Sequence, residues 1–313
     1  MSEKQRRLLL ITLSNIGDLV MTTPVLEALH LSYPQHLIDI VADSRSSELI
    51  KPCPYLGRLI HKDKQAGLSG IWSLVRTLRK FRYDVAVDLR TTFLTALIRC
   101  GQHGIKRRGT SIGTHAVQHH FTALAGILGP NFDIPPQRLW VEKRAAEKAS
   151  ELLRDLPSGR RLIVAPGANW PGKIWPVDCY EALIEQLRSD FDGVIVVGSN
   201  DDRDLSKRLQ ASCALPIVNL AGRTTLLEVA ACMSGAHAFV GNDSGLGHVA
   251  AALNVPTLTV FGPGRPERYR PWGARASVAF APNAELNLLE PVGVAETLRQ
   301  HLSGLSDLYN PTN

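Results

Sequence analysis

A single carboxylate stands at the start of a predicted helix close to the N-terminus. The stretch SNIGDLVMTTPVLEALH (14–30) places Asp18 behind Gly17, where an apolar strand over 7–13 gives way to a helix over 19–33. A carboxylate at a helix N-terminus is stabilised as the anion by about 0.3–1 kcal/mol, which is typical of a cap. In a cleft that excludes water, the same group can accept a proton from a reacting hydroxyl. The spacing alone leaves the cap and the general base evenly matched.

A second candidate site is rich in small residues and follows another predicted strand. In VGNDSGLGHVAAAL (240–253), Asp243, Ser244 and Gly245 directly precede a helix that carries His248 one turn later. Small residues let a ligand approach the backbone, and the free N–H groups of a first helical turn favour phosphate. The alternative is that Asp243 or Ser244 caps the helix, which is worth about 1 kcal/mol, and that His248 is a packed polar residue. Spacing slightly favours the cap.

The third stretch, PGANWPGKIWP (166–176), presents a lysine on a rigid loop. Its prolines restrict the backbone, and Trp170 and Trp175 stand on either side of Lys173. An ammonium held in this way can bind a diphosphate and neutralise charge that develops on a leaving group. The alternative is an ordinary surface lysine flanked by packed tryptophans.

Alternating strands and helices must position these residues. Apolar runs typical of strands alternate with amphipathic runs over 7–128, and the alternation restarts at 161 and continues to a last helix over 292–302. Such alternation predicts parallel sheets covered on both faces, with ligands at the carboxyl ends of the strands. We therefore expect an α/β protein with two doubly wound Rossmann-like domains, 1–156 and 157–313, facing each other across a cleft. We leave open whether the last helix packs on the second domain or back on the first.

Composition and charge narrow the functional classes. Lys and Arg exceed Asp and Glu by 22 to 14 in residues 1–155, and by 14 to 4 within 45–108, so the first half is expected to meet an anionic partner. No nucleic-acid-binding motif supports DNA or RNA as that partner. The five cysteines are scattered without a C-x-x-C pair, which argues against a zinc site and suits a reducing cytoplasm. No apolar stretch approaches the roughly 18 residues of a membrane span.

Taken together, the motifs resemble the ADP-heptose:lipopolysaccharide heptosyltransferases, which are glycosyltransferases of the two-domain GT-B type. The likeness covers nearly the whole chain. It runs through SNIGDLVMTTPVLEAL (14–29), YDVAVDL (83–89), PGANWPGKIWP (166–176), GNDSGLGHVAAALNVPTLTVFGP (241–263) and RYRPWG (268–273). The order and spacing of several motifs make this resemblance far more specific than one glycine-rich loop.

The resemblance assigns roles to the first and third stretches. Asp18 matches the family's proposed catalytic base, and Lys173 matches the lysine that contacts the donor diphosphate. Ala168 and Asn169 occupy loop positions that hold phosphate in relatives, where Thr or Ser is common, so a hydroxyl contact is lost here.

The resemblance also implies donor contacts elsewhere in the second domain. The donor-binding turn and helix start correspond to Asp243, Ser244, Gly245 and His248. Asn200, with Asp201 beside it, stands where relatives commonly have an acidic residue that binds the nucleotide ribose. The run DDRD (201–204) is interpreted as a solvated helix cap and not as a metal site.

The implied reaction is metal-independent sugar transfer with inversion, without a cofactor beyond the nucleotide sugar. An acceptor hydroxyl bound by the first domain attacks the anomeric carbon, and Asp18 receives its proton. The basic surplus fits an acidic acceptor such as the lipopolysaccharide inner core, with Arg90, Lys106, Arg107 and Arg108 as candidate contacts. It also suits peripheral attachment of a cytoplasmic enzyme to the anionic inner face of the membrane.

Two other classes stay open at this point. A nucleotide-sugar epimerase or hydrolase with the same fold would need its own acid–base pair around the sugar, and the first-domain loop offers one obvious carboxylate. A catalytically inactive nucleotide-sugar-binding module would have no reason to retain Asp18, Lys173 and Asp243 together.

Overall fold

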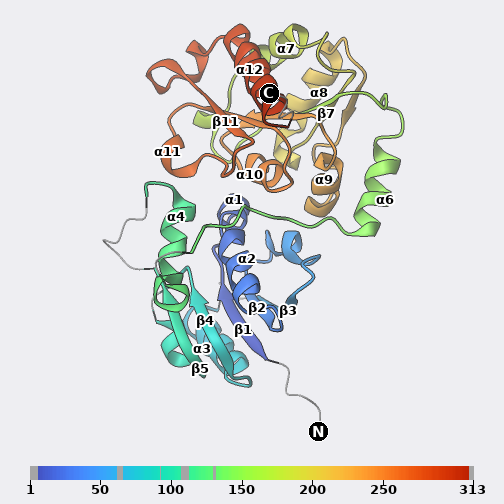
Figure 1. Ribbon diagram of the computed structural model, residues 1–313. Helices are drawn as coiled ribbons and strands as arrows, with labels where there is room; N and C mark the ends of the chain where they lie inside the picture. The colour runs from blue at the N-terminus through green and yellow to red at the C-terminus, as the bar shows by residue number, and fades with distance from the viewer. Residues whose placement is uncertain (1–5, 62–65, 92, 107–112, 130–131, 310–313) are drawn as a thin grey trace. The chain divides into compact units, whose positions relative to one another are not determined.

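The chain forms two compact units, Met1–Trp140 and Val141–Asn313. The computed structural model describes residues 6–61, 66–91, 93–106, 113–129 and 132–309, with side chains up to residue 305. Each unit contains one parallel sheet covered by helices (Figure 1). The expected α/β class with two doubly wound sheets is therefore confirmed.

The first unit has a five-stranded sheet in the order β3-β2-β1-β4-β5, in which every pair is parallel. Its strands are β1 (Arg7–Ile11), β2 (Leu37–Ala42), β3 (Leu56–His61), β4 (Tyr83–Asp88) and β5 (Cys100–Ile105). Its helices are α1 (Ile16–Val20), α2 (Thr23–Ser32), α3 (Gly67–Leu78), α4 (Ala116–Phe121) and α5 (Ala125–Leu128), with short 3-10 turns η1 (Ser47–Ile50), η2 (Leu94–Leu97) and η3 (Thr122–Leu124).

The second unit has a six-stranded parallel sheet in the order β11-β10-β9-β6-β7-β8. Its strands are β6 (Arg161–Ala165), β7 (Gly193–Val196), β8 (Ile217–Asn219), β9 (Ala238–Asn242), β10 (Thr257–Phe261) and β11 (Ala276–Phe280). Its helices are α6 (Lys143–Leu152), α7 (Val177–Gln186), α8 (Arg203–Ser212), α9 (Leu226–Met233), α10 (Gly245–Ala252), α11 (Pro266–Tyr269) and α12 (Pro291–Tyr309), with 3-10 turns η4 (Pro171–Lys173), η5 (Asn200–Asp202), η6 (Pro282–Ala284) and η7 (Leu286–Leu288).

Several element boundaries differ from the sequence-based expectation, and the helix expected over 19–33 is divided into α1 and α2. The run TFLTALIRC (92–100) reads as another helix of the alternation, but η2 and the edge strand β5 are found there. Gly101 of β5 lies so close to Asp84 of β4 that a Cβ there would meet its carbonyl oxygen at 2.8 Å. The two units divide between Trp140 and Val141, earlier in the chain than the boundary expected between residues 156 and 157. Helix α6 packs on α9 through its buried Ala145 and Ala149, which makes it part of the second unit.

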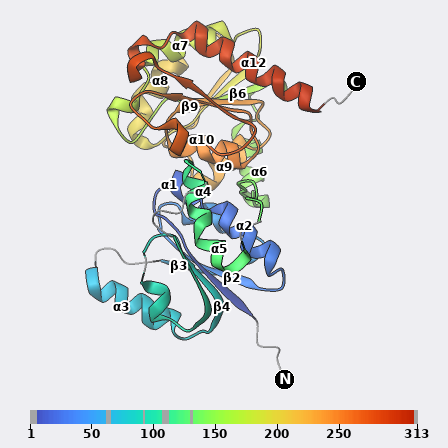
Figure 2. The ribbon, with the colours of Figure 1, turned by 60° about the vertical axis from the view of Figure 1, so that its left-hand side comes forward.

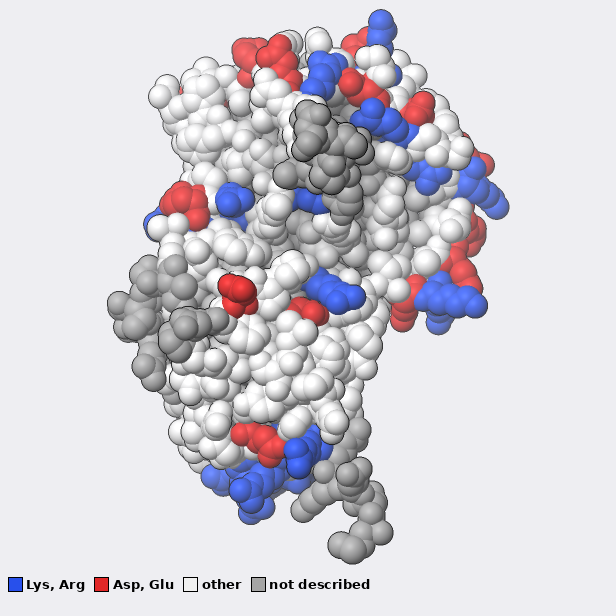
Figure 3. Space-filling view, viewed as in Figure 1, with Lys and Arg blue, Asp and Glu red and all other residues white. Residues whose placement is uncertain are grey.

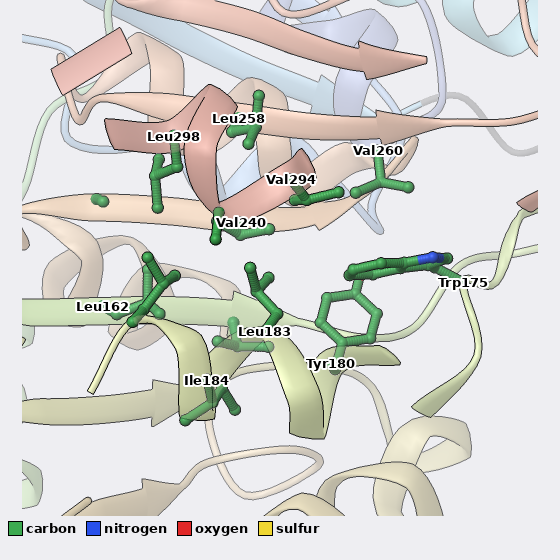
Figure 4. Close-up of a cluster of buried hydrophobic side chains, with 14 of the residues drawn as sticks. Leu162, Trp175, Tyr180, Leu183, Ile184, Val240, Leu258, Val260, Val294 and Leu298 are labelled. Carbon is green, nitrogen blue, oxygen red and sulfur yellow. The ribbon is translucent and has the colours of Figure 1, made fainter. Parts of the chain in front are cut away.

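Each sheet encloses its own apolar core. In the first unit, Leu74, Val75 and Leu78 of α3 pack on Leu9 and Ile11 of β1. In the second, the side chains of α7 and α12 meet those of β6, β9 and β10, with Trp175 and Tyr180 at one end (Figure 4). Helix α12 lies along α7 (Figure 2), so its buried residues belong to the second core. Among the described residues, no helix is long and apolar enough to cross a membrane.

The strand orders identify where ligands bind in sheets of this kind. Both orders reverse direction once, between β1 and β4 in the first unit and between β6 and β9 in the second. Open α/β sheets bind ligands in the crevice beyond the carboxyl ends of the strands at this switch point. The segments that follow β1, β4, β6 and β9 carry Asp18, Arg90, Lys173 and Asp243, in that order.

Candidate functional site

In the first unit, Asp18 occupies the first turn of α1, directly beyond β1. The Asn15 side-chain amide donates a hydrogen bond from Nδ2 to Oδ2 of Asp18, at 3.0 Å. Asn15 is the N-cap residue of α1, and its side chain makes no capping hydrogen bond. Within the described part of the chain, Asp18 thus accepts this hydrogen bond from a side chain and not from the helix backbone. Asp18 is half-buried, so its carboxylate stays accessible at the carboxyl edge of the sheet.

A buried aspartate shapes the neighbouring loop after β4. Asp88 is fully buried, and its Oδ1 accepts hydrogen bonds from the backbone N–H groups of Arg90 (2.9 Å) and Thr91 (2.7 Å). The Thr91 hydroxyl donates to the other carboxylate oxygen of Asp88. These bonds fix the turn, and the exposed Arg90 side chain leaves it at the carboxyl edge. Arg90 and Thr91 line a small cavity together with Thr12, Asp43 and Leu74.

Two further cations stand at this edge. Lys106 directly follows β5. Burial, with a smaller effect of the Lys106 charge, lowers the pKa of His120 to about 3. Neutral His120 therefore donates from Nδ1 to the carbonyl oxygen of Met21, at 3.2 Å. Arg45, beyond β2, donates from Nε to Oδ1 of Asp43 at 3.0 Å and was missed as an individual candidate, although the basic surplus over 45–108 includes it. The candidates Arg107 and Arg108 lie outside the described residues.

In the second unit, Lys173 and Asp243 form an ion pair. Lys173 Nζ lies 2.5 Å from Asp243 Oδ2, and the two side chains are 33% and 11% exposed. The pair joins the loop after β6 to the loop after β9, which are 70 residues apart in the chain. One face of the ammonium therefore rests on a fixed carboxylate, while its remaining N–H donors are available to a ligand.

Asn242, the last residue of β9, holds this arrangement in place. Its side chain is fully buried. Its Oδ1 accepts from the backbone N–H of Trp175 and from the hydroxyl of Tyr180, both at 3.0 Å, and its Nδ2 donates to the carbonyl of Pro166 at 2.6 Å. Both ends of the loop that carries Lys173 are thus bound to one amide. Asn242 did not stand out in the sequence, since its partners lie 62 to 76 residues away.

The start of α10 carries no side-chain cap, so the cap favoured by spacing is not formed. Ser244 is the N-cap residue, but its side chain makes no capping hydrogen bond, and its buried Oγ has no hydrogen-bond partner within the described residues. Asp243 pairs with Lys173 instead. The first N–H groups of α10, from Gly245 onward, are consequently left for another acceptor. His248 is buried one turn into the helix.

The remaining donor candidates lie beyond β6 and β7. Ala168 is half-buried and Asn169 exposed in the loop after β6. Asn200 and Asp201 are exposed in η5, where Asn200 lies against Gly222, a residue with φ +64°. Because β6 and β7 are neighbours in the sheet, both loops share its carboxyl edge.

The cap interpretation of the DDRD run is confirmed, with Asp202 as the carboxylate that forms it. Asp202 Oδ2 accepts from the backbone N–H of Ser199 at 2.7 Å and from its hydroxyl at 2.8 Å. The carboxylate also lies against Gly167, where a Cβ would meet Oδ1 at 1.9 Å. Across the described ranges, no group of three or more His, Cys, Asp or Glu side chains is arranged to hold a metal ion.

Comparison with known proteins agrees with this geometry. The family model "Glycosyltransferase family 9 (heptosyltransferase)" matches residues 71–290. The chain is 31% identical over 307 residues to lipopolysaccharide heptosyltransferase 2 of Salmonella typhimurium, covering 87% of each chain. It is 28% identical over 283 residues to lipopolysaccharide heptosyltransferase 3 of Escherichia coli, covering 82% of each.

A solved structure shows that the similarity extends to the fold. The structure of E. coli ADP-heptose lps heptosyltransferase II superimposes with a TM-score of 0.78 at 25% identity, covering 96% of this chain and 99% of that one. The family model spans more than half of the chain, and the sequence relatives cover most of it. The chain therefore belongs to glycosyltransferase family 9, the heptosyltransferases.

Proposed function

We propose that this protein transfers a heptose from ADP-heptose to a lipopolysaccharide core acceptor, with inversion at the anomeric carbon. The observation that carries the proposal is the ion pair of Lys173 with Asp243, set beside the uncapped start of α10 at the switch point of the second sheet. The relatives are lipopolysaccharide heptosyltransferases and an ADP-heptose lps heptosyltransferase, and their names supply the substrate classes.

The second unit is proposed to hold the donor. Lys173 and the N–H groups from Gly245 onward bind the diphosphate, with Ser244 and His248 beside it and Asp243 keeping the ammonium in position. Ala168 and Asn169 line the loop below the phosphates, and Asn200 and Asp201 lie toward the ribose. When the bond between the anomeric carbon and the diphosphate oxygen breaks, the leaving ADP gains negative charge. Fixed positive groups at that oxygen stabilise the transition state more than the ground state.

The first unit is proposed to bind the acceptor and to supply the base. An acceptor hydroxyl forms the new bond to the anomeric carbon from the face opposite the diphosphate, and Asp18 takes the hydroxyl proton. Arg90 and Lys106 at the same sheet edge, with Arg45 beside them, suit the phosphate and carboxylate groups of a lipopolysaccharide core. Such an acceptor would bring the enzyme to the inner face of the cytoplasmic membrane.

The direct test is product analysis with and without acceptor. We expect ADP-heptose and a heptose-deficient core acceptor to give a heptosylated acceptor and ADP in equal amounts, as measured by mass spectrometry. Free heptose in the absence of acceptor would indicate a hydrolase, and an isomerised nucleotide sugar an epimerase. A thermal-shift series of ADP-, UDP-, GDP- and CDP-sugars should give the largest rise in Tm with the ADP-sugar, because binding to the folded state stabilises it.

Replacing Lys173 by Met should weaken both donor binding and catalysis. The variant loses the ammonium that faces the diphosphate, so we expect kcat/KM to fall by about 10²–10³-fold. Calorimetry should show weaker binding of ADP. Lys173→Arg, which keeps the charge near Asp243, is the matched control and should retain more of both. An unchanged Kd for ADP in Lys173→Met would contradict the proposed role.

A further inference from the structure

Helix α3 of the first unit exposes large apolar side chains that its own fold does not use. Leu68 is 77% exposed and Trp72 is 63% exposed. They are four residues apart, so they lie on the same side of the helix. The exposed Arg76 continues this line by one more turn, and Lys80 follows just beyond the end of the helix. We call Leu68, Trp72, Arg76 and Lys80 the outer face of α3.

Packing fixes which way this face points. Away from this face, α3 carries Leu74 and Leu78, which are buried against the sheet. The helix cannot turn its outer face inward without exposing that core. A hollow lined by Ser69, Trp72, Ser73, Val75, Arg76 and Arg79 runs along the exposed side.

The surroundings of the outer face are strongly basic. Residues 66–106 contain seven Lys and Arg against two acidic residues, Asp84 and Asp88. Asp88 is fully buried in the turn after β4, and Asp84 pairs with His36 at 2.8 Å. Among the described residues, neither carboxylate forms an ion pair with Arg76, the one arginine of α3. Both blue and red side chains lie at the lower end of this unit in the view of Figure 3.

We propose that the outer face of α3 docks on an anionic lipid surface, with Leu68 and Trp72 inserted among the headgroups and Arg76 and Lys80 paired with lipid phosphates. Single exposed apolar residues are common on proteins, but a Trp and a Leu one turn apart, followed by cations, have the composition of an interfacial helix. Trp suits this position because its apolar ring carries a polar N–H that stays hydrated.

The topology connects this surface to the acceptor site. Helix α3 joins two parallel strands, β3 and β4, so it runs back across the sheet from the carboxyl edge. Its first turns, with Leu68 and Trp72, therefore lie nearer that edge than Lys80 does. This inference rests on the proposed transfer to a lipid-linked acceptor, whose lipid portion would stay in the membrane that α3 contacts.

Sedimentation with lipid vesicles tests the docking apart from the reaction. We expect the protein to bind vesicles that contain about a third phosphatidylglycerol more tightly than pure phosphatidylcholine vesicles, with binding weakened by salt. Leu68→Ser/Trp72→Ser and Arg76→Glu/Lys80→Glu should each bind the anionic vesicles about tenfold or more weakly. Quenching of tryptophan fluorescence by brominated lipid should be lost in Trp72→Phe, while binding is largely kept.

Matched controls use equally exposed residues elsewhere. Leu31→Ser on α2, at 61% exposure, and Lys143→Glu on α6, whose side chain is 92% exposed, should bind vesicles like the parent protein. All three α3 variants should transfer sugar normally to a delipidated acceptor. Failure of the parent protein itself to transfer sugar to that acceptor would refute the proposed function and not the docking. The docking proposal is overturned if the parent protein ignores anionic vesicles or if the α3 variants bind unchanged. It is also overturned if Leu68→Ser/Trp72→Ser abolishes a dimer of the protein and leaves vesicle binding unchanged.

Discussion

Asp18→Asn is expected to lower kcat by about 10²–10⁴-fold while ADP and ADP-heptose bind as before. The amide keeps the size of the side chain and its contact with Asn15 but cannot accept the proton of an attacking hydroxyl. The proposed donor contacts all lie in the second unit, so donor affinity should not depend on this residue. Single-turnover transfer and calorimetric titration of ADP on the same preparation measure the two quantities separately.

The stability of the Asp18→Asn variant distinguishes a catalytic base from a helix cap. Because Asp18 accepts its hydrogen bond from the Asn15 side chain, Asp18→Asn should change the free energy of unfolding by less than about 1 kcal/mol. Asn15→Ala serves as a graded control: it frees the carboxylate without removing it, so transfer should slow far less than in Asp18→Asn. Near-normal transfer by Asp18→Asn, or a large loss of stability in place of a loss of rate, would show that Asp18 serves the helix and not the reaction.

Asn242→Leu is expected to lower the free energy of unfolding more than Asp18→Asn or Lys173→Met. The substitution removes three hydrogen bonds at once and leaves the Trp175 N–H, the Tyr180 hydroxyl and the Pro166 carbonyl without this partner. Each buried polar group left unsatisfied costs about 1–3 kcal/mol, so the three groups together should cost about 3–9 kcal/mol. Calorimetry should show the melting transition of the second unit lowered by about 10 °C or more.

A double-mutant cycle with Tyr180→Phe isolates the cause. Tyr180→Phe alone should cost about 1 kcal/mol, because Asn242 Oδ1 keeps its bond from Trp175. In the Asn242→Leu background the same change should be neutral or stabilising, since it removes a buried hydroxyl that has lost its acceptor. Additive losses across the cycle would show that the amide does not act through these contacts. Donor affinity should also fall in Asn242→Leu, because the Lys173 loop loses both attachments.

The central strands of each sheet and the edge strand β3 could be predicted from sequence, and the other three edge strands could not. Buried strands such as β1 and β9 are continuous apolar runs, which parallel sheets covered on both faces require. Strand β5, with the sequence CGQHGI, has two glycines and is largely exposed at an edge, so it gives no such signal. The short edge strand β8 and the partly exposed β11 were not predicted for the same reason.

The candidate site divides in a similar way. Asp18, Lys173 and Asp243 stand out because each is a charged residue between a predicted strand and the body of the next helix, and that signal is local. The pairing of Lys173 with Asp243, and the bonds made by Asn242, depend on β6 and β9 being neighbours, which strand order alone decides. Asp202 shows the same limit: its place at a helix start indicated a cap, but its approach to Gly167 is a tertiary contact.

The attachment of both ends of the 166–175 loop to a single amide has an evolutionary consequence. Substitutions at Ala168 and Asn169 can alter the contacts offered to a nucleotide without shifting the lysine, since the loop's anchoring depends on Asn242 and not on those two side chains. Under the proposed donor site, the contacts offered to the nucleotide and the position of the lysine can then change independently of each other.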